Sequence, residues 1–377
     1  MPTTRVASFN VENMFDRAKA MNHATWAEGA PVLAAHARLN ELIQRDEYDE
    51  QTKEEMIELL GTLKLLRSDE SAYVRLRKIR GGFLTRKRSG ETVIAASGRD
   101  QWIGWIELIT EPVTALATKH TAMAIRDIGA QVLGVVEAES RPLLEMFSST
   151  MLKSVEGTPY DQVLLVDGND QRGIDVGLMT RDGHTVTDIR THIYDTDSSG
   201  VVFSRDCAEY HVRTPGGDRL IVLVNHLKSK GYGSEDDPIG AKRRSRQAAR
   251  IARIYAELVD NGADHIAVIG DFNDDPASEA LAPLFQGTPL RDISEHPDFE
   301  WGPRKGTYKS GNERDKIDYL LLSPALFAKS TGGGVFRKGV WRGSRTRDPW
   351  DIYETLTAEH HAASDHAAIY ADIDWTR

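Results

Sequence analysis

Short apolar runs rich in β-branched residues recur along the chain and limit the folds that it can adopt. Each run is five to seven residues long, which is typical of strands and too short for most helices. Helical spacing of apolar residues occurs between only some of the runs, at 115–128 and 250–258. This irregular order favours a mixed sheet or two packed sheets over a regular βαβ series. The expected strands are 5–11, 131–136, 162–166, 174–179, 219–225, 265–270, 316–322 and 367–373.

The region 16–112 differs from the rest of the chain. Residues 41–58 hold eight acidic and two basic residues in a helix-forming composition. Residues 73–90 hold seven basic residues and no acid, with a turn signal at Gly81-Gly82. Trp102 and Trp105 follow in another expected strand. We therefore predict one domain spanning 1–377 that carries an inserted, mostly helical subdomain at 16–112.

Composition excludes several classes of protein. With 40% hydrophobic and 28% charged residues, the chain has the make-up of a globular protein rather than a disordered one. Cys207 is the only cysteine, which rules out an intrachain disulfide and argues against a thiolate metal cluster. The sequence has no apolar leader and no stretch of about 18 apolar residues, so we expect a cytoplasmic monomer that does not bind membranes.

Polar residues stand at the ends of the apolar runs. A single Asn or Asp at such a position is most often a turn or cap residue. A whole set is more informative, because strand ends deliver side chains into a shared crevice and hold them rigidly. The set comprises Asn10, Glu137, Asn225, His226, Asp271, Asn273, Asp318, Asp365 and His366.

These residue types suit one kind of chemistry. Carboxylates and carboxamides are hard oxygen ligands, which fit Mg²⁺ or Mn²⁺ and not zinc. The two histidines, each near an aspartate, can transfer protons or stabilise developing charge. A hard metal combined with His/Asp pairs and arginine is suited to phosphoryl transfer.

Six motifs, in this order, resemble the endonuclease/exonuclease/phosphatase superfamily, which includes deoxyribonuclease I, exonuclease III and neutral sphingomyelinases. They span 5–373 apart from the insertion. The resemblance implies an α/β fold, a four-layer αββα sandwich of two mixed sheets with outer helices. It also implies a phosphoric ester hydrolase that depends on Mg²⁺ or Mn²⁺. The motifs are Phe9-Asn10-Val11-Glu12-Asn13, Val136-Glu137, Asn225-His226-Leu227-Lys228, Gly270-Asp271-Phe272-Asn273, Ile317-Asp318-Tyr319 and Ser364-Asp365-His366.

The resemblance also implies a metal site. Asn10 and Glu137 would hold the principal Mg²⁺, with Asp365 nearby. Family members often carry glutamine before the metal-binding glutamate, whereas valine stands there in this chain, and Glu139 is an alternative ligand. Glu12 falls where abasic-site endonucleases place an acidic residue, as a further metal ligand or a neighbour of one.

The catalytic roles carried over from the family leave alternatives open. Asp271 would orient or deprotonate the attacking water, or protonate the leaving oxygen. Asn273 would bind a phosphate oxygen or a second metal. His366, oriented by Asp318, would contact the scissile phosphate or act as a base. His226 would stabilise a non-bridging oxygen or act as a general acid.

Three further residues, Arg172, Asn225 and Lys228, are candidates for binding the substrate. The aromatic residue that abasic-site repair enzymes place near the phosphate has no clear counterpart around Gly173. His226 instead is a feature of the deoxyribonuclease I and sphingomyelinase branches. We therefore do not expect a dedicated abasic-site repair enzyme.

The net charge of −10 excludes a uniformly basic nucleic-acid-binding surface. However, the segments 73–90, 242–253 and 336–347 hold seven, six and five basic residues and no acid, which favours local tracking of a polyanion. We expect Trp102 and Trp105 in the core, with stacking on bases as the alternative. The predicted function is a nuclease of low sequence specificity acting on nucleic acid, with DNA as the expected partner. The alternatives are a phosphatase or phosphodiesterase acting on a small phosphate ester or phospholipid head group, and a non-catalytic binding module on the same scaffold.

Overall fold

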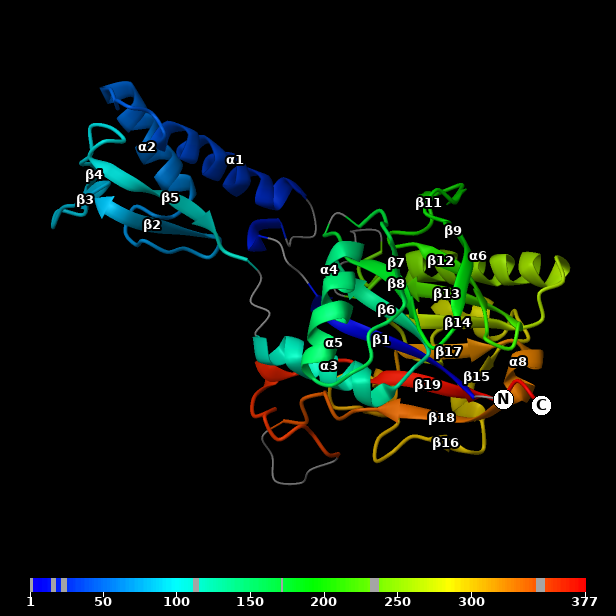
Figure 1. Ribbon diagram of the computed structural model, residues 1–377. Helices are drawn as coiled ribbons and strands as arrows, with labels where there is room; N and C mark the ends of the chain where they lie inside the picture. Colours follow the sequence, from blue (N-terminus) through cyan, green and yellow to red (C-terminus); the bar gives the residue numbers. More distant parts are fainter. Residues whose placement is uncertain are drawn as a thin grey trace. The chain divides into compact units, whose positions relative to one another are not determined.

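The computed structural model describes residues 3–14, 18–21, 26–110, 115–170, 172–230, 237–343 and 350–377. The chain divides into two compact units (Figure 1). The larger unit comprises Met1–Phe15 and Val113–Arg377, and the smaller unit comprises Asp16–Pro112.

The larger unit is built on two mixed β-sheets. In the first, β1 runs parallel to β6 and antiparallel to β19; in the second, β13 runs parallel to β14 and antiparallel to β12. The seven-stranded sheet has the order β16 (Phe299–Glu300), β18 (Ser330–Phe336), β19 (Ala368–Ile373), β1 (Thr4–Met14), β6 (Val132–Ala138), β8 (Asp175–Thr180) and β7 (Gln162–Val166). The six-stranded sheet has the order β15 (Arg291–Asp292), β17 (Asp318–Leu322), β14 (Ile266–Asp271), β13 (Arg219–His226), β12 (Cys207–Arg213) and β9 (Thr185–Arg190).

Helices cover the outer faces of both sheets and complete four layers (Figure 1). The inner faces of the two sheets share one core, to which Val136 and Ile269 belong. Ile125 of α3 packs on the outer face of the first sheet, and Ile251 of α6 packs on the outer face of the second. The predicted αββα sandwich is thereby confirmed. The helices are α3 (Ala115–Ile128), α4 (Arg141–Met146), α5 (Leu152–Ser154), α6 (Ala241–Asp260), α7 (Ala282–Phe285) and α8 (Pro324–Lys329), and a short ribbon pairs β10 (Thr196–Asp197) with β11 (Gly200–Val201).

All eight expected strands of the larger unit are present, within two residues at each end except for β1, which continues three residues beyond its expected end, to Met14. The apolar pattern missed the shorter strands β9, β10, β11, β15 and β16, and also β12 and β18. The last two were missed for different reasons. β12 alternates core residues with Glu209 and His211, which bond to each other and thereby satisfy polar groups that a buried strand would otherwise leave unpaired. β18 contains three glycines, which lack the side chains on which a strand pattern depends.

The smaller unit has its own hydrophobic core. Helices α1 (Trp26–Ile43) and α2 (Glu50–Thr62) are followed by strands β2 (Val74–Gly81), β3 (Leu84–Arg86), β4 (Thr92–Ile94) and β5 (Trp102–Leu108). β2 pairs with β5 and β3 with β4, so the unit combines its helices with two antiparallel strand pairs. The helical composition at 41–58 is also interrupted, because Asp49 accepts a hydrogen bond from the Thr52 backbone at 2.7 Å and begins a second helix.

Among the described residues, no helix combines the length and the apolar character needed to cross a bilayer.

Candidate active site

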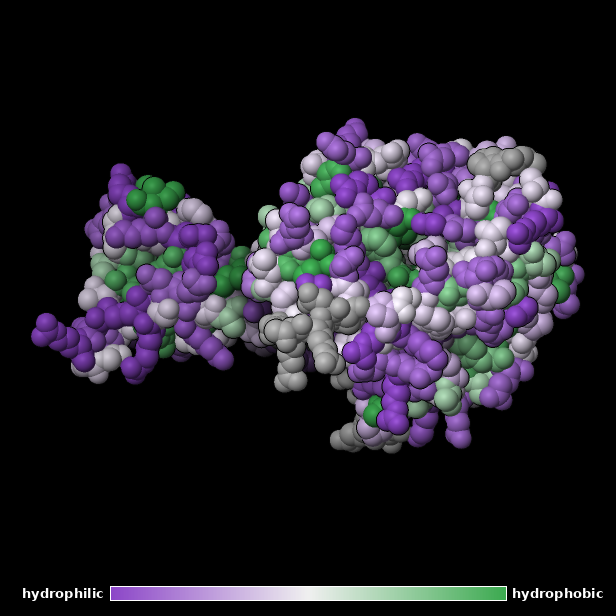
Figure 2. All heavy atoms as spheres, turned by 90° about the horizontal axis from the view of Figure 1, so that it is seen from below, coloured by the Kyte–Doolittle hydropathy of each residue, from purple (hydrophilic) through white to green (hydrophobic). Residues whose placement is uncertain are grey.

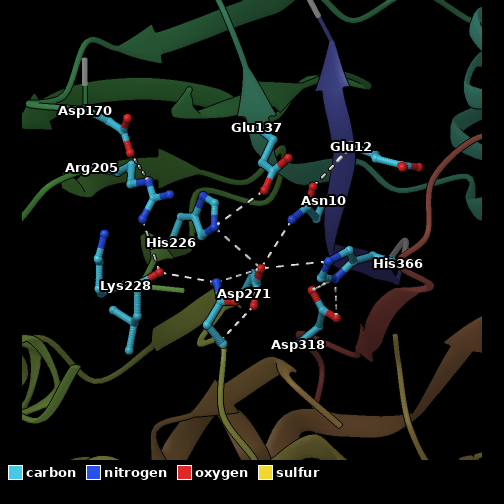
Figure 3. A network of polar contacts seen from close by, with 12 residues as sticks. Asn10, Glu12, Glu137, Asp170, Arg205, His226, Lys228, Asp271, Asp318 and His366 are labelled. Carbon is cyan, nitrogen blue, oxygen red and sulfur yellow. Dashed lines mark hydrogen bonds and ion pairs between the residues drawn. The ribbon is translucent and has the colours of Figure 1, made fainter. Parts of the chain in front are cut away.

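Most of the predicted site residues converge in one network of polar contacts, which Figure 3 shows. Regular strand alternation brings several of them there, because side chains two residues apart face the same side. Val222 and Val224 face the core between the sheets, and His226 continues that row. Ile269 leads in the same way to Asp271, and Val6 leads along β1 to Asn10.

Glu137 reaches the site by a different route. Val136 faces the shared core and Ala138 faces the helices, so regular alternation would turn Glu137 away from the site. The pairing of β6 with β8 shifts between Val136 and Ala138, and Glu137 adopts a left-handed φ of 68°. This bulge turns its carboxylate toward His226, with Oε1 3.6 Å from Nε2. Left-handed backbone at a non-glycine residue is costly and is frequent at functional sites.

Asp271 lies at the centre of the cluster, and its side chain is almost fully buried. Its Oδ1 accepts the Asn273 backbone N–H at 2.8 Å, and its Oδ2 accepts Nδ2 of Asn273 at 3.0 Å and Nδ2 of Asn10 at 3.2 Å. Gly270, directly before it, has a φ of 136° and packs so closely on Asn225 that a Cβ would lie 1.9 Å from its carbonyl oxygen. Burial raises the pKa of Asp271 to about 7, with Asp318 adding to the effect.

His366 lies on one side of Asp271, among carboxylates. Its Nδ1 contacts Asp318 Oδ2 at 2.9 Å, while its Nε2 is 3.9 Å from Asp271 Oδ2 and 3.7 Å from Asp365 Oδ1. Burial alone lowers the pKa of His366, but Asp318 and Asp271 raise it well above the ordinary value. Ser364 fixes the approach to His366, because its hydroxyl donates to the Asn10 carbonyl at 2.7 Å and accepts the His366 N–H at 2.9 Å.

His226 lies on the other side of Asp271, next to cationic groups. Its Nε2 is 3.5 Å from Asp271 Oδ2. Burial, reinforced by Arg205 and Arg172, lowers the pKa of His226 well below the ordinary value. The imidazole of His226 is therefore neutral at pH 7, whereas that of His366 is protonated.

Arg205 is the functional candidate that the sequence analysis missed. It stands in the loop before β12, its side chain is 1% exposed, and its Nε is 3.0 Å from Asp170 Oδ2. The same carboxylate holds Arg172 at 3.1 Å, so one aspartate positions two guanidiniums. Burial and these two arginines lower the pKa of Lys228 to about 8. No strand-end signal pointed to Arg205, because its position follows from tertiary packing of a loop.

The remaining predicted residues occupy different places. Asn273, with a φ of 55°, is in the cluster, and Nδ2 also donates to the Leu227 carbonyl at 3.2 Å. Asp365 borders the cluster beside His366, and the backbone N–H of Glu12 donates to Asn10 Oδ1 at 3.0 Å. Asn225 is not brought into the site. It precedes His226 on the strand and so faces the opposite side, where its Nδ2 donates to the Leu223 carbonyl at 3.0 Å.

The donor set around Asp271 fits a divalent cation. Glu137, His226 and Asp271 each offer a ligand atom within 4.8 Å of the others, and Asp271, Asp318 and His366 form a second such group. The first group contains two carboxylates and a neutral imidazole, so the group itself supplies no positive charge. Among the described residues, Glu137 rather than Glu139 belongs to these groups. Oxygen donors of this kind suit Mg²⁺ or Mn²⁺.

Comparison with known families agrees with this geometry. The sequence profile of the endonuclease/exonuclease/phosphatase family matches residues 96–330, which is more than half of the chain. The chain belongs to this family. Members of the endonuclease/exonuclease/phosphatase family are phosphoric ester hydrolases, so the chain is a hydrolase of that family. Residues 16–95, most of the smaller unit, lie outside the matched region.

Solved structures of the family share the fold. The mannosyl-6-phosphatase Bt3783 of Bacteroides thetaiotaomicron VPI-5482 is 18% identical, with a TM-score of 0.50 over 68% of this chain and 90% of that one. A second family protein from Bacteroides thetaiotaomicron is 16% identical, with a TM-score of 0.51 over 70% of this chain and 89% of that one. No curated protein matches the sequence.

Proposed function

We propose that this chain is a Mg²⁺- or Mn²⁺-dependent phosphodiesterase that hydrolyses nucleic acid, with DNA as the expected substrate. One observation carries the proposal: the buried Asp271 lies between a neutral and a charged histidine, with Asp318 raising the pKa of the charged ring, and burial and two arginines lowering that of the neutral one. Such a gradient of charge suits a phosphoryl group, whose oxygens need cations while the attacking water needs a base.

Glu137 and Asn10 are the residues that would hold the metal, with Asp271 and His226 facing it. The ion would neutralise charge that accumulates on the phosphoryl oxygens. The bulge at Glu137 supports this assignment, since it turns a carboxylate into the site at the cost of a left-handed backbone.

The protein's own groups divide the proton chemistry between them. Asp271, with a pKa of about 7, is suited to accept a proton from water near neutral pH. Asp318 accepts the hydrogen bond from Nδ1 of His366, so Nε2–H of the charged ring faces the site and can donate to a phosphoryl oxygen. His226 keeps a neutral ring beside Asp271 and Glu137, where a cation would compete with the metal.

The cationic group supports a diester as the substrate. Arg205 helps to lower the pKa of His226. Burial lowers the pKa of Arg205 itself, while Asp170, Glu137 and Asp271 act in the opposite direction. Arg172, which pairs with the same Asp170, and Lys228 add further cationic groups near Arg205. A polymer would place the reacting phosphate at Asp271 and a neighbouring phosphate at the arginines.

The test is a substrate panel with the purified full chain: supercoiled plasmid, single-stranded DNA, RNA and bis-p-nitrophenyl phosphate, each with Mg²⁺, Mn²⁺ or EDTA. Nicking of plasmid that needs a divalent metal and fails in an Asp271→Asn variant is the expected result. Turnover of only the small diester would overturn the nucleic-acid assignment and move the search to small phosphate esters. An Asp275→Asn variant is the matched control, because Asp275 lies in the same loop and bonds only to its neighbours in the described structure.

A further inference from the structure

In two of the three basic segments, several of the described cations are paired with acids or buried. In 242–253, on α6, Arg244 pairs with Asp274 at 2.9 Å, Arg246 with Asp197 at 2.6 Å and Arg250 with Asp195 at 2.6 Å. In 336–347, Arg337 is buried and donates to backbone carbonyls, and 344–349 lie outside the described residues. Among the described residues, the segment 73–90 in the smaller unit joins exposed cations to exposed apolar side chains.

The β2–β5 sheet of the smaller unit has one covered and one uncovered face. Val74, Trp102 and Ile106 face the helices and join the core with Leu39 of α1 (Figure 1). The strand register places Arg75 opposite Glu107, Arg77 opposite Trp105 and Arg80 opposite Ile103 on the other face. The expectation that both tryptophans are buried is therefore wrong for one: Trp102 is 1% exposed and Trp105 is 41% exposed.

Charge is distributed unevenly along this uncovered face. The acids lie toward one end, where Glu70 pairs with Arg75 at 2.7 Å and Glu107 pairs with Arg77 at 2.7 Å. At the other end Arg80 is exposed and donates to the Asp100 backbone carbonyl, at 3.2 Å, with no acidic partner among the described residues. Lys78 is also exposed, but it pairs with Gly104 and so belongs to the face of Trp102 and Ile106.

Apolar surface accompanies that cationic end. Ile79 sits where the pairing of β2 with β5 shifts, and its side chain is 68% exposed. Ile103 and the exposed ring of Trp105 stand on the neighbouring strand. Hydrophilic side chains cover much of this unit's surface in Figure 2, with hydrophobic patches between them.

We propose that this uncovered face of β2 and β5 binds single-stranded nucleic acid, with Trp105 stacking on a base and Arg77 and Arg80 contacting phosphates. An exposed aromatic ring on a strand, flanked by cations, is the arrangement with which proteins hold single strands without reading their sequence. The charge is complementary to a polyphosphate although the chain as a whole is acidic, with a net charge of −10. The proposal rests on the proposed function only in that the bound strand is also the polymer to be cut.

Binding is measured with the full chain in EDTA, by fluorescence anisotropy of a labelled single-stranded oligothymidylate. We expect Trp105→Ala to raise the Kd about tenfold and Trp105→Phe to bind nearly as wild type, because phenylalanine still stacks. Arg77→Gln combined with Arg80→Gln should weaken binding and flatten its salt dependence. The matched control is Lys53→Gln combined with Lys64→Gln, which removes the same charge from the helical side of this unit.

Cleavage assays separate this surface from the active site. The Trp105 and arginine variants should raise the KM for single-stranded DNA and leave turnover of bis-p-nitrophenyl phosphate unchanged. The proposal is overturned if the oligothymidylate does not bind, or if both sets of variants bind it as wild type does. If binding depends on this face while no nucleic acid is cleaved, the surface stands and the proposed nuclease function fails.

Discussion

The two histidines of the candidate site differ in their surroundings more than in their positions. His366 and His226 lie on opposite sides of the same carboxylate, 3.9 Å and 3.5 Å from Asp271 Oδ2. Asp318 and Asp271 raise the pKa of His366 well above the ordinary value, whereas burial and two arginines lower that of His226 well below it. One residue type thereby supplies a cation on one side of the site and a neutral ring on the other, and the difference comes from the neighbours alone.

The largest effect is expected at the residue that both histidines share. Asp271→Asn keeps the size of the side chain and removes the base, so kcat/KM should fall by about 10⁴-fold. The measurement is a steady-state assay of bis-p-nitrophenyl phosphate with Mg²⁺, with Asp275→Asn as the control. An Asp271→Asn enzyme within tenfold or so of wild type would mean that another group removes the proton.

The charged histidine is the next position to test. His366→Gln retains a hydrogen-bond donor but loses the positive charge, and we expect kcat/KM to fall by about 10³-fold. His226→Gln replaces a ring that is already neutral, so any fall in its kcat/KM would not come from a lost charge. The measurement is kcat/KM of wild type and both variants at increasing ionic strength. The same salt dependence for both variants would contradict the assigned charges.

The orienting carboxylate gives a prediction about pH. Asp318 raises the pKa of His366, so Asp318→Asn should lower that pKa. If the protonated ring is the active form, the alkaline limb of the kcat/KM profile moves to lower pH, with about 10–100-fold lost at neutral pH. A profile that keeps its alkaline limb, or moves it upward, would assign that limb to another group.

On the cationic side, Arg205→Lys should have a smaller effect. Lysine keeps the charge and loses the fork that fits both Asp170 and a phosphate, so we expect inorganic phosphate to inhibit about tenfold less tightly. Arg250→Lys is the control, since Arg250 lies on α6 and pairs with Asp195. Equal inhibition of both variants and wild type would remove Arg205 from the phosphate site.

The smallest effect is on stability. The folded chain keeps the Asp271 proton up to about pH 7, whereas the ordinary pKa is 3.8. Between these values the folded state binds more protons than the unfolded state, so the free energy of unfolding falls as the pH rises. In EDTA at about pH 8, Asp271→Asn should therefore melt a few degrees above wild type, and the two Tm values should converge in acid. A lower Tm for the variant at that pH would contradict the raised pKa.

The sequence predicted the parts of the site that regular alternation controls. His226 and Asn10 each continue a row of core residues, so the strand pattern alone placed them. Glu137 was also predicted as a residue at the end of an apolar run, but the bulge that turns it inward has no signature in such a run. Arg205 depends on loop packing against Asp170, which no local pattern records.

The basic segments show the same limit on a larger scale. The sequence shows a run of arginines on α6 but not their acidic partners, which come from distant parts of the chain. Asp197 of β10, for example, pairs with Arg246. Likewise, alternation along β5 distinguishes the buried Trp102 from the exposed Trp105 only once the helices show which face is covered. Sequence identifies charge and aromatic content, whereas tertiary packing decides which of it is accessible.

The most direct test of the central claim is nicking of supercoiled plasmid by wild type, Asp271→Asn and Asp275→Asn, each with Mg²⁺, Mn²⁺ or EDTA. The account predicts metal-dependent nicking by wild type and Asp275→Asn, none with EDTA and none by Asp271→Asn. Nicking that persists in Asp271→Asn or in EDTA would contradict it, because the buried carboxylate and the metal site around it would then not be the reaction centre.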